Sequence, residues 1–150
     1  MNYNYAEDIA EATKLIEALE GSVLTKVLIN VVEPEFNVVF LDTSNGVFAV
    51  QGESGGEYLG IRHIKDMPSL VSEQGYIICE YPPYNAFLNH TICQIRQIGT
   101  AWNGHGLELS FQGITDQTMI IQSIYSGDKP KDLEDCLRLG IGQYSDTWNG

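Results

Sequence analysis

The spacing of apolar residues changes once along this chain, and that change limits the folds open to it. Between Ala6 and Glu20, apolar side chains recur every three or four residues, which predicts an amphipathic helix. Gly21 follows directly and suits a helix end, because glycine adopts positive φ without steric cost. After Gly21, apolar and polar residues mostly alternate, which predicts strands. One helix followed by many short strands predicts an α+β domain.

Turn-forming residues separate these short strands. Asn45-Gly46 between two apolar runs is a strong hairpin signal, and Gly113 to Asp116 predicts a second turn. We expect helical turns at Met67 to Glu73 and at Lys131 to Leu139. The predicted strands are Val23–Val32, Phe36–Leu41, Val47–Val50, Tyr58–Ile64, Tyr76–Tyr81, Leu88–Ile98, Leu107–Phe111 and Thr118–Ile124.

The order of strands and loops occurs twice, once in residues 21-64 and once in residues 88-127. When the two segments are aligned, Val27 corresponds to Ile95, Asn45 to Asp116, and Phe48 to Met119. An internal duplication explains this likeness, but any two meanders of alternating residues can align in the same way. We therefore expect one domain over residues 1-150. Its N-terminal helix packs on a mainly antiparallel sheet built from two similar three-stranded meanders.

Charge argues against two classes of partner. The chain has 150 residues, with 20 acidic and 8 basic side chains and a net charge of -12. A protein needs cationic side chains to bind the phosphates of nucleic acid or an anionic membrane surface. We therefore expect neither nucleic acid nor a membrane as a partner. Residues 1–75 hold 12 of the acids and 4 of the bases, which makes the first half the expected contact side for a basic protein.

The sequence contains no recognisable catalytic or metal-binding motif. Walker, GxSxG and HExxH patterns are missing, and His63, His90 and His105 stand singly. We expect no enzyme activity, no cofactor and no metal. A site that pairs His63 or His105 with a carboxylate stays open as an alternative.

Features of the N-terminus and the cysteines favour the cytoplasm. The chain has no secretory signal and no apolar run long enough to span a bilayer. Cys79, Cys93 and Cys136 form no CxxC pair, and each lies in an apolar stretch. We expect three reduced, buried thiols.

Acidic and aromatic residues in the predicted loops are the candidates for a contact surface. A solvated acidic face is the plain alternative, since carboxylates are abundant here. Tyr58, Tyr84 and Trp102 could instead be stacking platforms of a β module that binds a small molecule or carbohydrate. The candidate partner-binding residues are Glu33, Glu35, Glu53, Glu57, Tyr58 and Trp102.

Three short motifs lie between Leu88 and Ile124: Trp102-Asn103-Gly104, Gly106-Leu-x-Leu-Ser-Phe111 and Ser123-Ile124. With these motifs the stretch resembles small uncharacterised bacterial β-rich proteins of the toxin-immunity type. The resemblance implies a non-catalytic acidic protein that neutralises a cognate secreted toxin, and it transfers no site residue. Toxins that act on nucleic acid carry basic clefts, and an acidic partner is steered to such clefts.

Overall fold

Ten antiparallel strands make up most of the described chain. The computed structural model describes residues 14–32, 35–53, 58–73, 76–98, 106–123 and 137–143. Every pairing between these strands is antiparallel, which confirms the predicted sheet type. The strands are β1 (Val23–Val32), β2 (Glu35–Thr43), β3 (Gly46–Glu53), β4 (Tyr58–Ile64), β5 (Val71–Glu73), β6 (Tyr76–Glu80), β7 (His90–Ile98), β8 (Gly106–Phe111), β9 (Ile114–Ser123) and β10 (Leu137–Gln143).

Helix is limited to two short segments among the described residues. The predicted N-terminal helix is present over residues 14–19, while residues 6–13 of that prediction lie outside the described residues. Gly21 has a φ of 87°, as expected for a residue just past a helix end. A 3₁₀ helix, η2 (Pro82–Phe87), follows β6. The fold is therefore mainly β, which corrects the α+β prediction.

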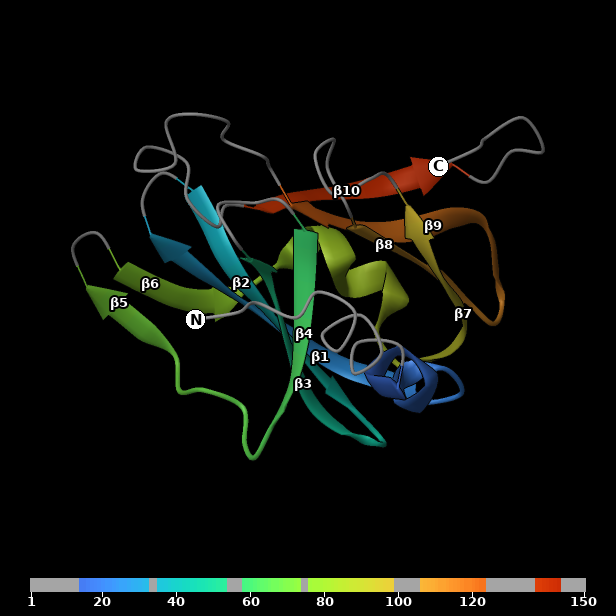
Figure 1. Cartoon of the computed structure of the whole chain (residues 1–150), viewed down its shortest axis with the longest axis horizontal. Coiled ribbons are helices and arrows are strands. Elements are labelled where there is room, and N and C mark those ends of the chain that lie inside the picture. The colour runs from blue at the N-terminus through green and yellow to red at the C-terminus, as the bar shows by residue number, and fades with distance from the viewer. Residues whose placement is uncertain are drawn as a thin grey trace, which may run out of the picture.

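Six of the strands close into a ring. β1 pairs with β2 along its length and with β7 at its start, while β2 pairs with β10 at its own start. Strands β10, β9, β8 and β7 are neighbours in that order, so the ring runs β1-β2-β10-β9-β8-β7 (Figure 1). β3 and β4 extend the sheet beside β2, and β6 and β5 extend it beside β1. The result is one ten-stranded sheet that closes on itself. We call β1–β6 the first sheet and β7–β10 the second sheet; β3 and β4 face β8 and β9 across the interior.

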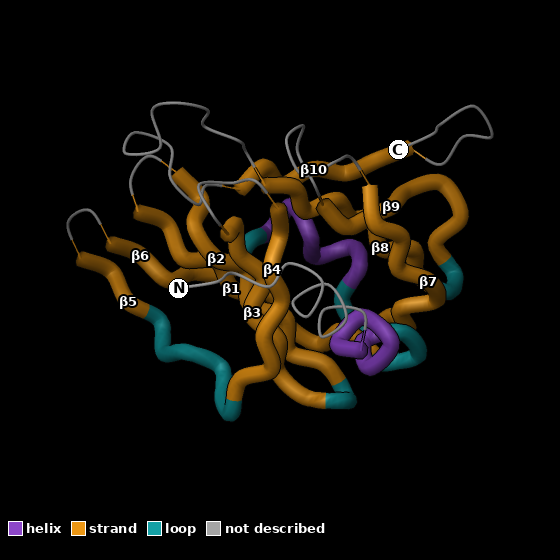
Figure 2. Tube along the Cα trace, viewed as in Figure 1, coloured by secondary structure: helices purple, strands orange, loops and turns teal. Residues whose placement is uncertain are grey.

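The hydrophobic core lies between these two sheets. Alternate residues of each long strand point into it, such as Val39 and Leu41 of β2 and Leu107 and Leu109 of β8. Both short helices add buried residues to the same core (Figure 2). No helix in the described part of the chain has the length and apolar content that crossing a membrane requires.

Both additional helical turns were predicted wrongly where the structure describes them. Residues 67–70 have no regular structure, and Val71 begins β5, where it pairs with Ile78 of β6. Leu137 to Leu139 belong to β10, which pairs with β9 along all of its length; residues 131–136 lie outside the described residues. In each case a neighbouring strand supplies hydrogen bonds that local spacing does not reveal.

One predicted turn is confirmed and the other is displaced. Ser44 and Asn45 form the turn between β2 and β3, and Gly46 has a φ of 123°. The second hairpin turns at Gln112 and Gly113. Asp116 therefore lies inside β9 and does not occupy a turn position equivalent to that of Asn45.

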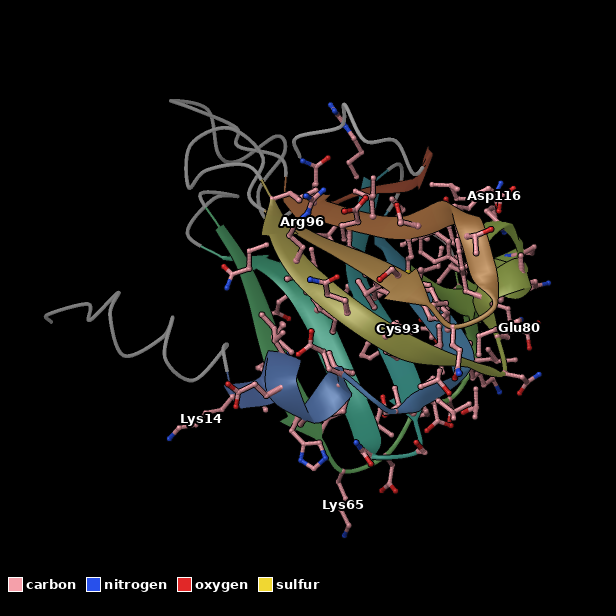
Figure 3. The ribbon with its side chains drawn as sticks, turned by 90° about the vertical axis from the view of Figure 1, so that its right-hand side faces the viewer. Lys14, Lys65, Glu80, Cys93, Arg96 and Asp116 are labelled. Atoms are coloured by element: carbon pink, nitrogen blue, oxygen red, sulfur yellow. The ribbon has the colours of Figure 1, made fainter. Side chains whose placement is uncertain are left out.

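The cysteine prediction is wrong for Cys93. The register of β7 against β8 shifts between Ile92 and Gln94, so Cys93 is the extra residue of a β-bulge and falls out of the inward alternation. Its side chain is exposed on β7 (Figure 3). Cys79 is half-buried, and Cys136 lies outside the described residues.

Tyr84 of η2 joins this helix to two strands. The side chain is 1% exposed, and its hydroxyl donates to the carbonyl of Ile120 on β9 at 2.6 Å. The same hydroxyl accepts from the backbone N–H of Gly140 on β10 at 3.1 Å. Burial raises the pKa of Tyr84, the nearby Tyr81 adds to this, and the hydrogen bond with Gly140 opposes it.

Tyr84→Phe is expected to lower the free energy of unfolding by about 1–3 kcal/mol at neutral pH, because Ile120 and Gly140 each lose a buried partner. The difference from the wild type should shrink above pH 10.0, the ordinary tyrosine value. Above that pH, Tyr84 loses its proton in the unfolded wild type but keeps it in the folded wild type. Rising pH therefore favours unfolding of the wild type, and the variant, which has no hydroxyl at residue 84, lacks this effect. Urea unfolding at neutral and alkaline pH measures both effects. A constant difference across this range would contradict them.

Candidate functional site

Strand register gathers distant parts of the first sheet at one end. Val32 at the end of β1 lies opposite Glu35 at the start of β2. Glu53 at the end of β3 lies opposite Tyr58 at the start of β4. Since β2 and β3 are antiparallel neighbours, these two pairs lie at the same end of the sheet.

Strands of the second sheet end at the same place. Ile98 of β7 lies opposite Gly106 of β8, and Ser123 of β9 lies opposite Leu137 of β10. Leu137 also lies opposite Phe36 at the start of β2, which brings the two groups of strand ends together. They lie along the upper side of Figure 1. We name this region the connection end and define it by Val32, Glu35, Glu53, Tyr58, Ile98, Gly106, Ser123 and Leu137.

The six candidate partner-binding residues all belong to links between strands that meet at the connection end. Glu35, Glu53 and Tyr58 are terminal residues of β2, β3 and β4, and only their backbone is described. Glu33 and Glu57 lie outside the described residues, as does Trp102 in residues 99–105. The flanking strand ends therefore bring together three links that the sequence alone leaves unrelated.

Charge is unevenly distributed between these links and the rest of the chain. Residues 33–35, 53–58, 99–105 and 124–136, which join strands at the connection end, contain eight acidic and two basic residues. The sequence-based prediction favoured the first half of the chain for contact. The register adds a segment of the second half, residues 124–136, because Ser123 and Leu137 are direct neighbours. This acidic segment was visible in the sequence, but its position was not.

Gly106 allows β8 to start close against β9. A Cβ at this position would meet the carbonyl oxygen of Ile121 and would lie 2.8 Å from the Cα of Gln122. No side chain fits there without movement of the β9 backbone. Gly106 is also the first residue of the Gly-Leu-x-Leu-Ser-Phe pattern noted in the sequence, so the glycine of that pattern has a structural reason at the connection end.

A charged cluster lies on the outer face of the second sheet. Glu108 of β8 accepts from Arg96 of β7 at 2.8 Å and from the hydroxyl of Thr118 on β9 at 2.8 Å. The side chain of Glu108 is 9% exposed and that of Arg96 is 45% exposed. Both carboxylate oxygens already have partners, so the geometry fits a structural ion pair rather than a general base poised for a substrate.

Arg96→Ala is expected to cost about 1–3 kcal/mol of stability, because it leaves the buried Glu108 carboxylate with Thr118 alone. The exposed guanidinium keeps this below the cost of breaking a fully buried pair. The double variant Arg96→Ala/Glu108→Ala should recover part of the loss, since it removes the buried charge as well. Urea unfolding of the wild type, both single variants and the double variant measures this coupling. Strictly additive losses would contradict the predicted ion pair.

Among the described residues, His63, His90 and Tyr84 form no visible ligand site. His63 is exposed and packs beside Phe48 with ring centroids 5.1 Å apart. Nδ1 of His90 lies 3.0 Å from the carbonyl oxygen of Gln112, and His105 lies outside the described residues. In the part of the chain that the structure describes, no three potential metal ligands come together. Tyr84 is buried by the protein itself, so it is unavailable as a stacking platform for a ligand.

Comparison of the chain with protein-family models, with curated proteins and with solved structures gave no match.

Proposed function

We propose that this protein is a non-catalytic acidic binding protein of the cytoplasm, specifically an immunity protein that neutralises a cognate bacterial toxin by direct binding. The observation that carries this proposal is the convergence of acid-rich links at the connection end. Four links from both sheets begin and end there, with eight acidic residues against two basic ones. Loops held by a rigid β scaffold are a common way to build a recognition surface.

A basic toxin domain is the partner that this charge pattern fits. Links that are rich in acidic residues attract a cationic surface from a distance and raise the rate of encounter. They also oppose the approach of acidic partners, which gives specificity. Tyr58 and Trp102 belong to two of the same links, and aromatic side chains of this kind often anchor such interfaces.

The density of negative charge differs between the links and the rest of the chain. The links carry a net charge of -6 over 29 residues, and the other 121 residues together carry the remaining -6. Lys14 and Lys65 lie at the lower side of Figure 3, whereas Arg96 lies near the upper side, on the strand that ends at the connection end. Arg62 and Lys65 are both exposed at the far end of β4. An asymmetric charge distribution turns the acidic end toward a cationic partner during approach.

The direct test is co-expression of the full chain with the protein encoded by the adjacent gene. We expect the two proteins to co-purify as a stable complex, and we expect the chain to restore growth of cells that produce the neighbouring protein. The expected complex weakens as salt rises, because exposed charges are screened. Lack of both complex formation and growth rescue would overturn the proposed function.

We further propose that β1–β3 and β7–β9 descend from one duplicated unit. Each set consists of consecutive antiparallel neighbours. Their buried residues follow the same alternation in the second and third strands: Val39 and Leu41 with Leu107 and Leu109, and Phe48 and Val50 with Met119 and Ile121. A duplication would explain why links from both halves meet at one end.

A further inference from the structure

We propose that Asn45 is a site of spontaneous deamidation, and that its conversion to an acid releases the N-terminal helix from the β2–β3 hairpin. This inference concerns a covalent modification and is independent of the proposed binding function. It rests on three contacts around the turn at Ser44 and Asn45.

The side-chain amide of Asn45 fastens the hairpin to the helix. Its Nδ2 donates to the backbone carbonyl of Ala18 at 2.8 Å. Ala18 lies in the last turn of the helix, where carbonyl groups lack partners within the helix. The backbone N–H of Asn45 lies 3.2 Å from the hydroxyl of Thr43, which helps to fix the turn. Because Asn45 is exposed, water reaches the same amide that makes the tether.

The residue after Asn45 has to be a glycine. Gly46 has a φ of 123°, a conformation that residues with side chains rarely adopt. A Cβ on Gly46 would lie 2.5 Å from Nε2 and 3.2 Å from Cδ2 of the His63 imidazole. The tether requires an amide side chain at one position and the turn requires glycine at the next. The fold therefore builds in an Asn-Gly pair, the sequence in which a side chain hinders attack by the following backbone nitrogen least.

The reaction needs water and no other reagent. The backbone nitrogen of Gly46 attacks Cγ of Asn45 and gives up its proton to solvent as the new N–C bond forms. Nδ2 then takes up a proton from solvent, the bond between Cγ and Nδ2 breaks, and Nδ2 leaves as ammonia. Water opens the resulting five-membered imide at either of its carbonyl carbons, which yields aspartate or isoaspartate. No atom changes oxidation state in either step.

Conversion replaces a donor with a charged acceptor. The new carboxylate cannot donate to the Ala18 carbonyl and instead places negative charge beside an oxygen atom. The C-terminal end of a helix already carries partial negative charge, so the contact becomes repulsive. The helix residues then lose this hydrogen bond to the hairpin and keep the packing of Ile16 and Leu19 in the core.

Two exposed asparagines in the same sample are internal controls for the reaction. Asn85 and Asn89 are exposed like Asn45, but alanine and histidine follow them. Purified full-length protein is kept in mildly alkaline buffer at physiological temperature, and its peptides are analysed by mass spectrometry at intervals. We expect the peptide with Asn45 to show conversion of amide to acid well before those with Asn85 and Asn89. Conversion of Asn45 no faster than that of these two would overturn the assignment of the site.

Designed variants test the release of the helix separately. Asn45→Asp reproduces one product and is expected to lower Tm by about 2–4 °C through loss of one hydrogen bond. It should also speed hydrogen exchange of the backbone amides in residues 14–20. Asn45→Gln is the matched control, because it keeps an amide and resists conversion. Wild-type Tm and wild-type exchange in Asn45→Asp would overturn the proposed release.

Discussion

Reversing four acidic residues at the connection end is expected to abolish most of the affinity for the toxin partner. In the variant Glu33→Lys/Glu35→Lys/Glu53→Lys/Glu57→Lys, repulsion replaces attraction at two of the links. Charge reversals at one interface act together on encounter and on retention, so we expect at least about a 100-fold rise in Kd, or about 2.7 kcal/mol. Titration of the purified variant against the protein encoded by the adjacent gene measures it.

A matched control separates position from net charge. Glu17, Asp66, Glu80 and Asp116 are exposed acids that lie away from the connection end. Figure 3 shows Glu80 and Asp116 on the side of the molecule away from the end of β7. Their reversal to lysine changes the net charge by the same amount as the test variant. We expect its Kd to stay within about fivefold of wild type, with a modest loss of association rate from weaker steering. Equal loss in both variants would show that net charge, and not the connection end, governs binding.

Local sequence patterns were enough to predict the best-formed strands. β1 and β4 have the predicted bounds, and β-branched residues make up six of the ten positions of β1. The Asn45-Gly46 turn was also predicted correctly, since the positive φ at Gly46 demands a glycine. These features depend on residues close together in the chain, and the sequence displays such residues directly.

Elements that depend on distant partners were missed. Leu137, Leu139 and Ile141 alternate as a strand requires, but the preceding leucine and cysteine share a helical spacing with Leu137 that suggests helix. Pairing with β9 decides the outcome. The helix η2 was also missed, because it gains its stability from burial of Tyr84 and Phe87 against distant strands.

The sequence was enough to predict which residues belong to the candidate site, but not that they meet at one end of the sheet. Loops rich in acids and aromatics are visible in the sequence, and they supplied all six candidates. Their convergence depends on the contact of Leu137 with Phe36, which joins residues far apart in the chain. No local periodicity carries that information, so the place of residues 124–136 beside the other links follows only from the pairing of Ser123 with Leu137.

Phe87→Ala is expected to be among the most destabilising single changes in the described part of the chain. Phe87 is 0% exposed, stacks on Phe111 at 4.9 Å and meets Tyr84 at 5.9 Å. Truncation of a buried phenylalanine costs about 3–5 kcal/mol, through lost apolar burial and the cavity that remains. For a chain of this size that corresponds to a fall in Tm of about 10 °C. Thermal unfolding followed by circular dichroism measures it.

Two variants in the same helix show whether packing causes the loss. Phe87→Leu keeps most of the buried volume and is expected to cost less than about 2 kcal/mol. Asn85→Ala changes an exposed side chain two residues earlier in the helix and should alter stability by no more than about 0.5 kcal/mol. A large loss in Asn85→Ala would mean that the helix itself, and not the aromatic contact, is the fragile element. If Phe87→Ala unfolds like the wild type, η2 does not close the core in solution. The segment between β6 and β7, which contains η2, would then not help to hold the second sheet against the first sheet. The part of the connection end that the second sheet supplies would lose that support.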